Sequence, residues 1–415
     1  MTPAGRPGEG LVLPRLLAIE DALFTGERLR VYGIGLVAGL AIAAVICWTR
    51  DIGAWVVRPD GRLGNIDFCW IWVSGKFAAM AHPSWIYRQA IYAAAQNIYY
   101  RPGECLFLHQ YVYPPTFLFL TYPLGLLPYL AAYGVWVGVT LAIYLTAIYA
   151  ILPRKAALAA AVIPAFALKN FQLGHNGFLT AALVGLSLVV IERRPWLAGI
   201  SLGLLICKPH FAVLFPLVLI ASRNWRALGG AAAATALLGI AAAIAFGRET
   251  WLAFFASLFD RNVGLSPQTG VVLLLESVYG LLQWVGASAR LAAGVHLAVA
   301  AAAAIMVSAV WARPYPPDLK AALLPAASLL FSPYVLLYDF CILSIAIAFF
   351  VKDGLVRGFL AGERAVLLLA VLLLDVVPIP LGSVSCVIVV LLISRRIAAA
   401  GGLPATRVNG LAVGG

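Results

Sequence analysis

Charged side chains are scarce in this chain of 415 residues. Asp, Glu, Lys and Arg make up 11% of the residues, whereas 63% are hydrophobic. A soluble globular domain carries about 25% charged residues, so a shortage of this size excludes an ordinary soluble enzyme. Together with a mean hydropathy of +0.96, it predicts a protein whose surface is covered mostly by lipid.

The motifs of several enzyme classes are also missing. There is no P-loop, which excludes an ATPase, and there is no HExxH or Cys/His zinc pattern. No Asp-x-Asp pair occurs, which argues against a metal-bound nucleotide-sugar site. We therefore expect neither a metal nor a cofactor. The six cysteines form no CxxC pair; Cys69 and Cys105 either form a disulfide in one outer loop or remain two small hydrophobic residues.

Acidic residues are outnumbered, because 29 Lys and Arg face 17 Asp and Glu for a net charge of +12. The basic residues cluster in short segments between apolar runs, as they do in the cytoplasmic loops of membrane proteins. The excess charge therefore indicates topology rather than nucleic-acid binding. No small-residue cleavage site follows a short apolar core near the start, so we expect no removable signal peptide. We interpret residues 1–30 as a cytoplasmic N-terminal segment.

The apolar runs predict an all-α polytopic membrane protein with about twelve transmembrane helices. A single transmembrane domain covers residues 31–394, and residues 395–415 form a cytoplasmic tail. Some runs are shorter than the roughly 20 residues of a full crossing, which is tolerated where helices line a cavity in the protein. The expected spans are residues 31–48, 130–152, 156–168, 177–191, 196–207, 211–221, 227–246, 291–311, 320–331, 335–351, 364–376 and 381–394.

Two long loops are expected on the outer face, at residues 49–129 and 247–290. Within the first, residues 113–128 are apolar enough to form a span, which would invert the orientation of everything downstream. The inverted orientation would place nearly all basic loops outside, so we interpret this segment as a re-entrant or surface-lying hairpin. The unusual polar residues then gather on outward turns, which is where we expect chemistry.

Asp67 lies in the first long loop, within the aromatic-rich stretch Asn65–Trp72. A carboxylate near a bilayer surface is costly to keep unless it has a task. It can act as a general base that accepts a proton from an attacking hydroxyl, or it can pair with Arg58 or Arg62 of the same loop. The loop also holds many aromatic residues, Tyr113 among them, which form an interfacial belt or stack on sugar rings.

Lys208 separates two short apolar runs and is followed by Pro209 and His210. A proline breaks a helix and can open a pocket. Lys208 can therefore bind a phosphate as a point charge, although it can also be a lysine that snorkels from a helix end.

Two further groups of polar residues are candidates. Gln172, His175 and Asn176 lie in a turn with two glycines, and they either bond to sugar hydroxyls or cap the turn. Tyr338 and Asp339 lie in an apolar run. An aromatic residue there is more often packing, whereas an acid within a membrane segment is a functional candidate by default.

Several short motifs follow one another in a fixed order along the chain. An Asp-Phe pair with aromatics follows the first span, and Pro-Ser-Trp-Ile-Tyr (83–87) and Tyr-Pro-Pro (113–115) come next. QLGHNG (172–177), Lys208-Pro209 and SPYVLLYD (332–339) then follow. In this order the chain resembles glycosyltransferase family 87, whose members usually carry Gln where His175 stands. The family comprises polytopic GT-C enzymes that use polyprenyl-phosphate sugars, commonly mannose, outside the membrane.

The resemblance implies a membrane glycosyltransferase with a GT-C-like fold. It would transfer a hexose, with mannose expected, from a polyprenyl-phosphate donor to a cell-envelope glycan or glycolipid, with inversion and with Asp67 as the base. The protein would lie in a bacterial inner membrane, with its active site on the extracytoplasmic face. The other assigned residues are Lys208, His210 and Arg261 for the donor phosphate, and Gln172, His175, Asn176, Tyr113, Tyr338 and Asp339 for the sugar or acceptor.

Two other classes of protein fit the composition. A transporter or lipid flippase could use a carboxylate for proton coupling, although its site should lie near the midplane of the membrane. A non-catalytic scaffold for envelope assembly would leave Asp67 and Lys208 apart in space. Convergence of Asp67, Lys208 and the 172–177 turn on one outward cavity would favour the enzyme.

Overall fold

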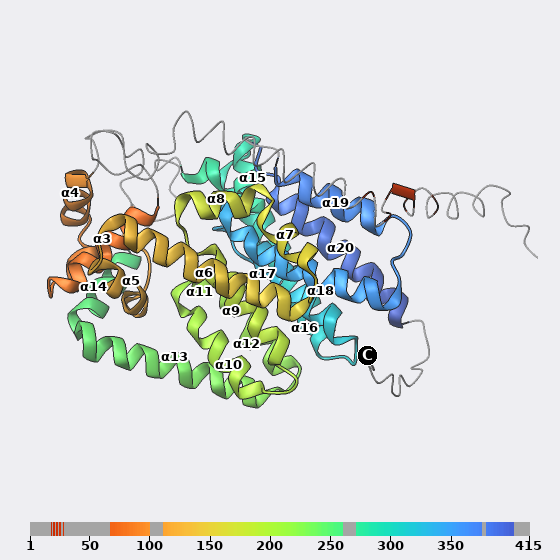
Figure 1. Ribbon diagram of the computed structural model, residues 1–415, viewed down its shortest axis with the longest axis horizontal. Coiled ribbons are helices and arrows are strands. Elements are labelled where there is room, and N and C mark those ends of the chain that lie inside the picture. Colours follow the sequence, from red (N-terminus) through yellow and green to blue (C-terminus); the bar gives the residue numbers. More distant parts are fainter. Residues whose placement is uncertain are drawn as a thin grey trace, which may run out of the picture.

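The computed structural model describes residues 67–99, 111–259, 271–375 and 379–401, together with the single residues 18, 20, 22, 23, 25 and 28. Throughout these residues the protein is helical and contains no strand (Figure 1). The predicted first span, Arg261 and Cys105 lie outside the described residues. The role of Arg261 and the pairing of Cys105 with Cys69 therefore stay open predictions.

Within the described ranges, four helices are long and apolar enough to cross a membrane. The prediction of an all-α membrane protein is confirmed, whereas the number of about twelve spans is not. The four helices are α6 (Tyr129–Ile151), α13 (Trp225–Phe246), α16 (Ala289–Trp311) and α20 (Gly382–Gly401).

Other predicted spans are short or broken helices. The segment predicted as 156–168 forms α7 (Lys155–Val162) and α8 (Ala165–Leu173), which are bent by 67° and count as a fifth span only if taken together. Pro164 precedes α8, and a proline cannot continue the hydrogen-bond ladder of the helix before it. Non-helical backbone at membrane depth is tolerated where protein surrounds it.

The chain around Lys208 is broken in the same way. It runs through α10 (Pro195–Gly203), the 3-10 turn η3 (Leu204–Cys207), α11 (Pro209–Ala212) and α12 (Leu214–Ala221). The other helices that form the body of the protein are α9 (Gly177–Val190), α14 (Arg248–Leu258), α15 (Val278–Trp284), α17 (Pro317–Phe331), α18 (Cys341–Arg357) and α19 (Glu363–Leu373).

The first loop contains a pair of crossing helices, α3 (Phe68–Ala79) and α5 (Leu118–Gly125). With eight residues, α5 spans only about 12 Å and cannot cross a bilayer. The two backbones touch at glycines: a Cβ on Gly75 would lie 2.0 Å from the Thr121 carbonyl oxygen, and one on Gly125 would lie 2.2 Å from Gly75 C. This segment is helical, and its predicted re-entrant or surface position relative to the membrane stays a prediction.

The aromatic helices gather at one end of the molecule. In Figure 1, α3, α5 and α14 lie together with α4 (Gln89–Tyr99) at the end where α6 begins. Tyr129, the first residue of α6, contacts the rings of Phe68 and Trp72. The main core lies deeper, where α17 is buried on all sides along residues 321–330. A helix that is apolar all round belongs in such a position.

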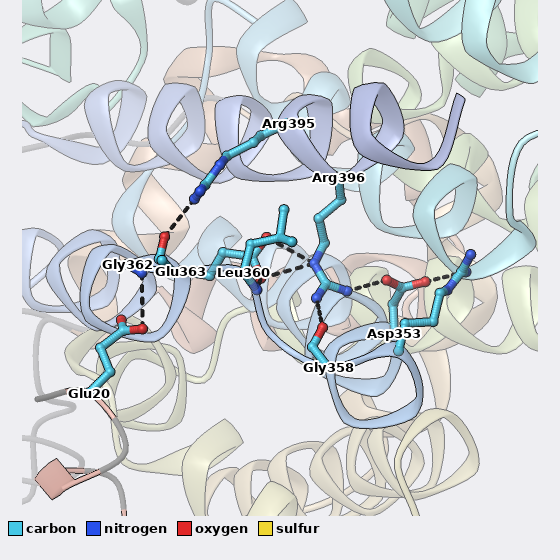
Figure 2. A network of polar contacts seen from close by, with 10 residues as sticks. Glu20, Asp353, Gly358, Leu360, Gly362, Glu363, Arg395 and Arg396 are labelled. Atoms are coloured by element: carbon cyan, nitrogen blue, oxygen red, sulfur yellow. Dashed lines mark hydrogen bonds and ion pairs between the residues drawn. The ribbon is translucent and has the colours of Figure 1, made fainter. Parts of the chain in front are cut away.

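A buried ionic network joins α18, α19 and α20 (Figure 2). The guanidinium of Arg396 donates through Nε to both oxygens of Glu363, at 2.9 and 3.0 Å, and also bonds to Asp353 and to the Gly358 carbonyl. Glu20 accepts from the backbone N–H of Gly362 at 2.9 Å, at the start of α19. The last helix thus continues beyond its predicted end at 394, and Arg396 is a structural residue rather than part of a basic tail.

Candidate functional site

A buried ion pair joins two segments that lie 131 residues apart in the chain. Lys208 Nζ donates to Asp339 Oδ1 at 2.5 Å, and the side chains are only 5% and 1% exposed. Asp339 Oδ2 accepts from the backbone N–H of Leu336 at 3.0 Å. Asp339 lies in the 3-10 turn η6 (Leu337–Phe340), directly before α18. The two residues had been predicted to serve different parts of the site, and the structure joins them in one largely neutralised pair.

The 172–177 turn packs against the same segment. His175 stacks on Tyr338, with ring centroids 3.7 Å apart, and Lys208 Nζ lies 5.1 Å from the centroid of the Tyr338 ring. A Cβ on Gly177 would lie 2.4 Å from the Tyr338 carbonyl oxygen, so only glycine fits this approach. Tyr338 therefore contacts both the turn and the ion pair.

The turn also contains a buried carboxamide. Asn176 is fully buried, and neither of its side-chain polar atoms has a hydrogen bond of good geometry to a described residue, although the Tyr113 hydroxyl lies near the carboxamide. By contrast, Asn170 Oδ1 accepts from the backbone N–H of Gly177 at 2.9 Å. Buried polar groups are nearly always hydrogen-bonded. The Asn176 side chain is thus a group that a bound hydroxyl could satisfy.

Tyr113, Trp70 and Tyr338 form one aromatic side of the site, called here the aromatic wall. The Tyr113 hydroxyl lies 3.4 Å from His175 Nε2, and the Tyr113 ring stacks on Trp70 with centroids 5.1 Å apart. Burial raises the pKa of the Tyr113 phenol well above its usual value, the Asp339 carboxylate adds to the rise, and the nearby Asn176 carboxamide opposes it. The phenol therefore stays protonated and can donate a hydrogen bond.

Asp67 directly precedes α3 and is partly buried. Its neighbour Phe68 touches the turn, because a Cβ on Gly174 would lie 2.7 Å from Phe68 Cβ; Gly174 has a φ of 62°, which glycine adopts without strain. Burial raises the pKa of the Tyr334 phenol, and the carboxylates of Asp339 and Asp67 raise it further. Asp67 and Asp339 therefore both lie near enough to Tyr334 to act on its hydroxyl.

The remaining predicted residues lie at the margin. Gln172 accepts from Lys169 Nζ at 3.3 Å on the exposed side of α8. His210 packs on Phe211 with ring centroids 4.2 Å apart, and its Nε2 is buried with no hydrogen-bond partner among the described residues. Because a buried imidazolium next to Lys208 would be repelled, we expect His210 to meet the donor phosphate as a neutral hydrogen-bonding group.

Sequence reasoning missed three features of this site. It did not link Lys208 to Asp339, it read Trp70 only as one of many loop aromatics, and it passed over Asn170. An asparagine in the last turn of α8 was the available signal. No group of three or more His, Cys, Asp or Glu within the described ranges is placed to hold a metal ion.

The fold and the site define a helical integral membrane protein with a buried polar centre, enclosed by aromatic rings and helix breaks. The family model for glycosyltransferase family 87 matches residues 111–333, more than half of the chain. The chain belongs to glycosyltransferase family 87, and it is a membrane glycosyltransferase. No curated protein and no solved structure matches it. The matched region includes the turn and Lys208 and stops short of Asp67 and Asp339.

Proposed function

We propose that the protein transfers a hexose, with mannose as the first candidate, from a polyprenyl-phosphate donor to a cell-envelope glycan or glycolipid. The reaction would take place at the extracytoplasmic face of a bacterial inner membrane. The observation that carries this proposal is a continuous series of contacts. It leads from the start of α3, next to Asp67, through the 172–177 turn and Tyr338 to the buried Lys208–Asp339 pair.

Asp67 would accept the proton of the acceptor hydroxyl as its oxygen attacks C1 of the donor sugar. The new bond forms between the acceptor oxygen and C1 while the bond from C1 to the phosphate oxygen breaks, and the lipid phosphate leaves with the electron pair. Attack from the opposite side inverts the anomeric centre. The partly buried position of Asp67 suits a group that must meet a substrate from outside.

Lys208 would stabilise the charge of the departing phosphate. An ammonium group has three N–H donors, and the contact with Asp339 uses one of them. Asp339 also prevents the buried Lys208 from remaining an unpaired charge when the site is empty. Fixed positive groups near a developing negative charge supply a large part of the catalysis in such sites.

The sugar would lie against the aromatic wall, where the Asn176 carboxamide and the Tyr113 hydroxyl can bond to its hydroxyls. His175 would contact the same ligand from its stack on Tyr338. A transporter or flippase gains no support from any contact described above.

The test of the catalytic assignment is the conservative variant Asp67→Asn in the purified, reconstituted protein. A general base contributes about 10²- to 10⁴-fold to a rate, so we expect turnover with polyprenyl-phosphate mannose and extracted envelope lipids to fall by at least about 100-fold. Glu249→Gln is the matched control, because Glu249 is an exposed acid in the first turn of α14. Unchanged turnover in Asp67→Asn, with a folded protein, would remove Asp67 from the mechanism.

A further inference from the structure

A cavity of about 610 Å³ opens at the end of the helix bundle opposite the candidate active site. α6 and α9 begin at the candidate site and end at this cavity, where Ile151 and Leu188 form part of the wall. α18 begins just after Asp339 and reaches the cavity at Phe349. A volume of this size is typical of small-molecule sites, and this cavity shares no residue with the site described above.

Positive charge dominates the cavity wall. Arg193, Arg223, Lys320 and Lys352 line it together with only two carboxylates, Glu192 and Asp318. Four cations against two anions leave an excess of two positive charges. Neither arginine forms an ion pair with any residue that the structure describes. An anion that enters the cavity therefore meets unneutralised guanidinium groups.

The two lysines are held in place. Lys352 Nζ bonds to Asp318 Oδ1 at 2.8 Å, and Lys320 Nζ donates to the carbonyl oxygen of Trp311 at 3.3 Å.

Arg223 has a φ of 55° in the turn between α12 and α13. This left-handed conformation is strained for a non-glycine residue. The strain thus falls on a residue whose side chain borders the cavity.

Apart from Ser222 and Asn224, the rest of the wall is apolar and includes the rings of Trp311 and Phe349. A cavity that combines arginines with apolar rings suits an amphiphile with a negatively charged head. We propose that this cavity binds the phosphate-bearing headgroup of an anionic lipid from the membrane leaflet at that end. The basic loops predict that this end is cytoplasmic, where anionic lipids attract basic side chains. The proposal stands independently of the sugar-transfer reaction.

The experiment measures lipid retention by the full-length protein, purified in detergent and analysed by native mass spectrometry. The probes are phosphatidylglycerol, phosphatidylcholine and inorganic phosphate. The test variant is Arg193→Gln combined with Arg223→Gly, because glycine adopts the backbone conformation of residue 223 without strain. The matched control is Arg194→Gln combined with Arg226→Gln, which removes the same charge from the same end at exposed residues that do not line the cavity.

We expect wild type to retain phosphatidylglycerol in preference to phosphatidylcholine. Its affinity should fall by at least about tenfold in the test variant, since tenfold corresponds to the loss of a single charge-assisted contact and the variant removes two arginines. In the control it should stay within about twofold. Equal losses in the two double variants would show general attraction between charges and would overturn the proposal. Binding of inorganic phosphate without selective lipid retention would overturn it as well, since the ligand would then be a free anion.

Discussion

At the scale of single residues, the Lys208–Asp339 pair decides how the candidate site can work. Two charges removed from water are costly unless each has a partner, and here each side chain is at most 5% exposed. The sequence placed Lys208 at a helix break and Asp339 in an apolar run, but it could not place the two side by side. The contact depends on how η3 and η6 pack, which no local pattern of residues encodes.

This pairing makes a prediction that separates stability from catalysis. Asp339→Asn should lower the free energy of unfolding by about 3–5 kcal/mol, because it leaves the ammonium of Lys208 buried without a counter-charge. The double variant Lys208→Met with Asp339→Leu should recover most of that loss, since it removes both charges, and yet should remain inactive. Thermal unfolding in detergent measures the first effect and turnover measures the second. Full activity in the double variant would show that the pair is only structural.

At the scale of secondary-structure elements, the crossing of α3 and α5 depends on two glycines in contact. Gly75→Ala would place a methyl group 2.0 Å from a backbone oxygen. Backbone cannot move aside as a flexible side chain does, so we expect destabilisation of at least about 1–3 kcal/mol. Gly134→Ala is the control, because no atom outside its own helix lies within 4 Å of the added carbon, and there we expect no loss or a gain of up to about 1 kcal/mol. Equal melting temperatures for the two variants would contradict the close crossing.

The ends of α18, α19 and α20 are tied by one arginine. Arg396→Met would leave Glu363 and Asp353 buried without their shared partner, and we expect a loss of about 3–5 kcal/mol in the free energy of unfolding. Arg395→Met is the matched control, because Arg395 is exposed and its side chain donates to one carbonyl, that of Ala361, at 2.7 Å. Its loss should stay near about 1 kcal/mol. Comparable melting temperatures would show that the network in Figure 2 adds little to stability.

The sequence predicted the elements better than their crossings. Apolar runs located α6, α13 and α16 to within about two residues, since lipid-facing helices carry their signal in composition. The run at 156–168 was read as one span, although Pro164 divides it into two short helices. The run at 196–207 was also read as a span, but it holds only the short helix α10 and the 3-10 turn η3. The basic residues 395 and 396 looked alike as topology signals, because exposure and burial of a side chain depend on neighbours distant in the sequence.

At the scale of the whole molecule, broken helices and long unbroken helices have different roles. The helix break at Lys208 lies in the candidate site, where backbone can approach a ligand, whereas the long unbroken helices form the frame around it. This division explains why the number of spans could not be predicted from the short apolar runs. A span count assumes that every apolar run crosses the membrane, and a run that turns back within the protein has the same composition.

The second long loop, expected at residues 247–290, is linked to the start of α20 by Glu276, an acid whose protonation changes near neutral pH. Glu276 accepts from the backbone N–H of Gly382 at 2.9 Å, at the start of α20, and its own N–H bonds to the Val335 carbonyl at 2.8 Å. Burial raises the pKa of Glu276 from 4.5 to about 7, although the bond from Gly382 opposes the rise. The folded protein therefore binds a proton more tightly than the unfolded chain does. The stabilisation is complete below pH 4.5 and is lost as the pH rises through about 7.

Stability should accordingly fall between pH 5 and pH 8, by at most about 3 kcal/mol from this group. Glu276→Gln keeps the shape of the side chain and removes its titration, so its melting temperature should vary less with pH and should exceed that of wild type at pH 8. Melting curves of both proteins in one detergent, recorded across this range, measure the difference. If the slope of the variant equals that of wild type, another group causes the pH dependence, and the loop is not held to α20 through a titrating carboxyl.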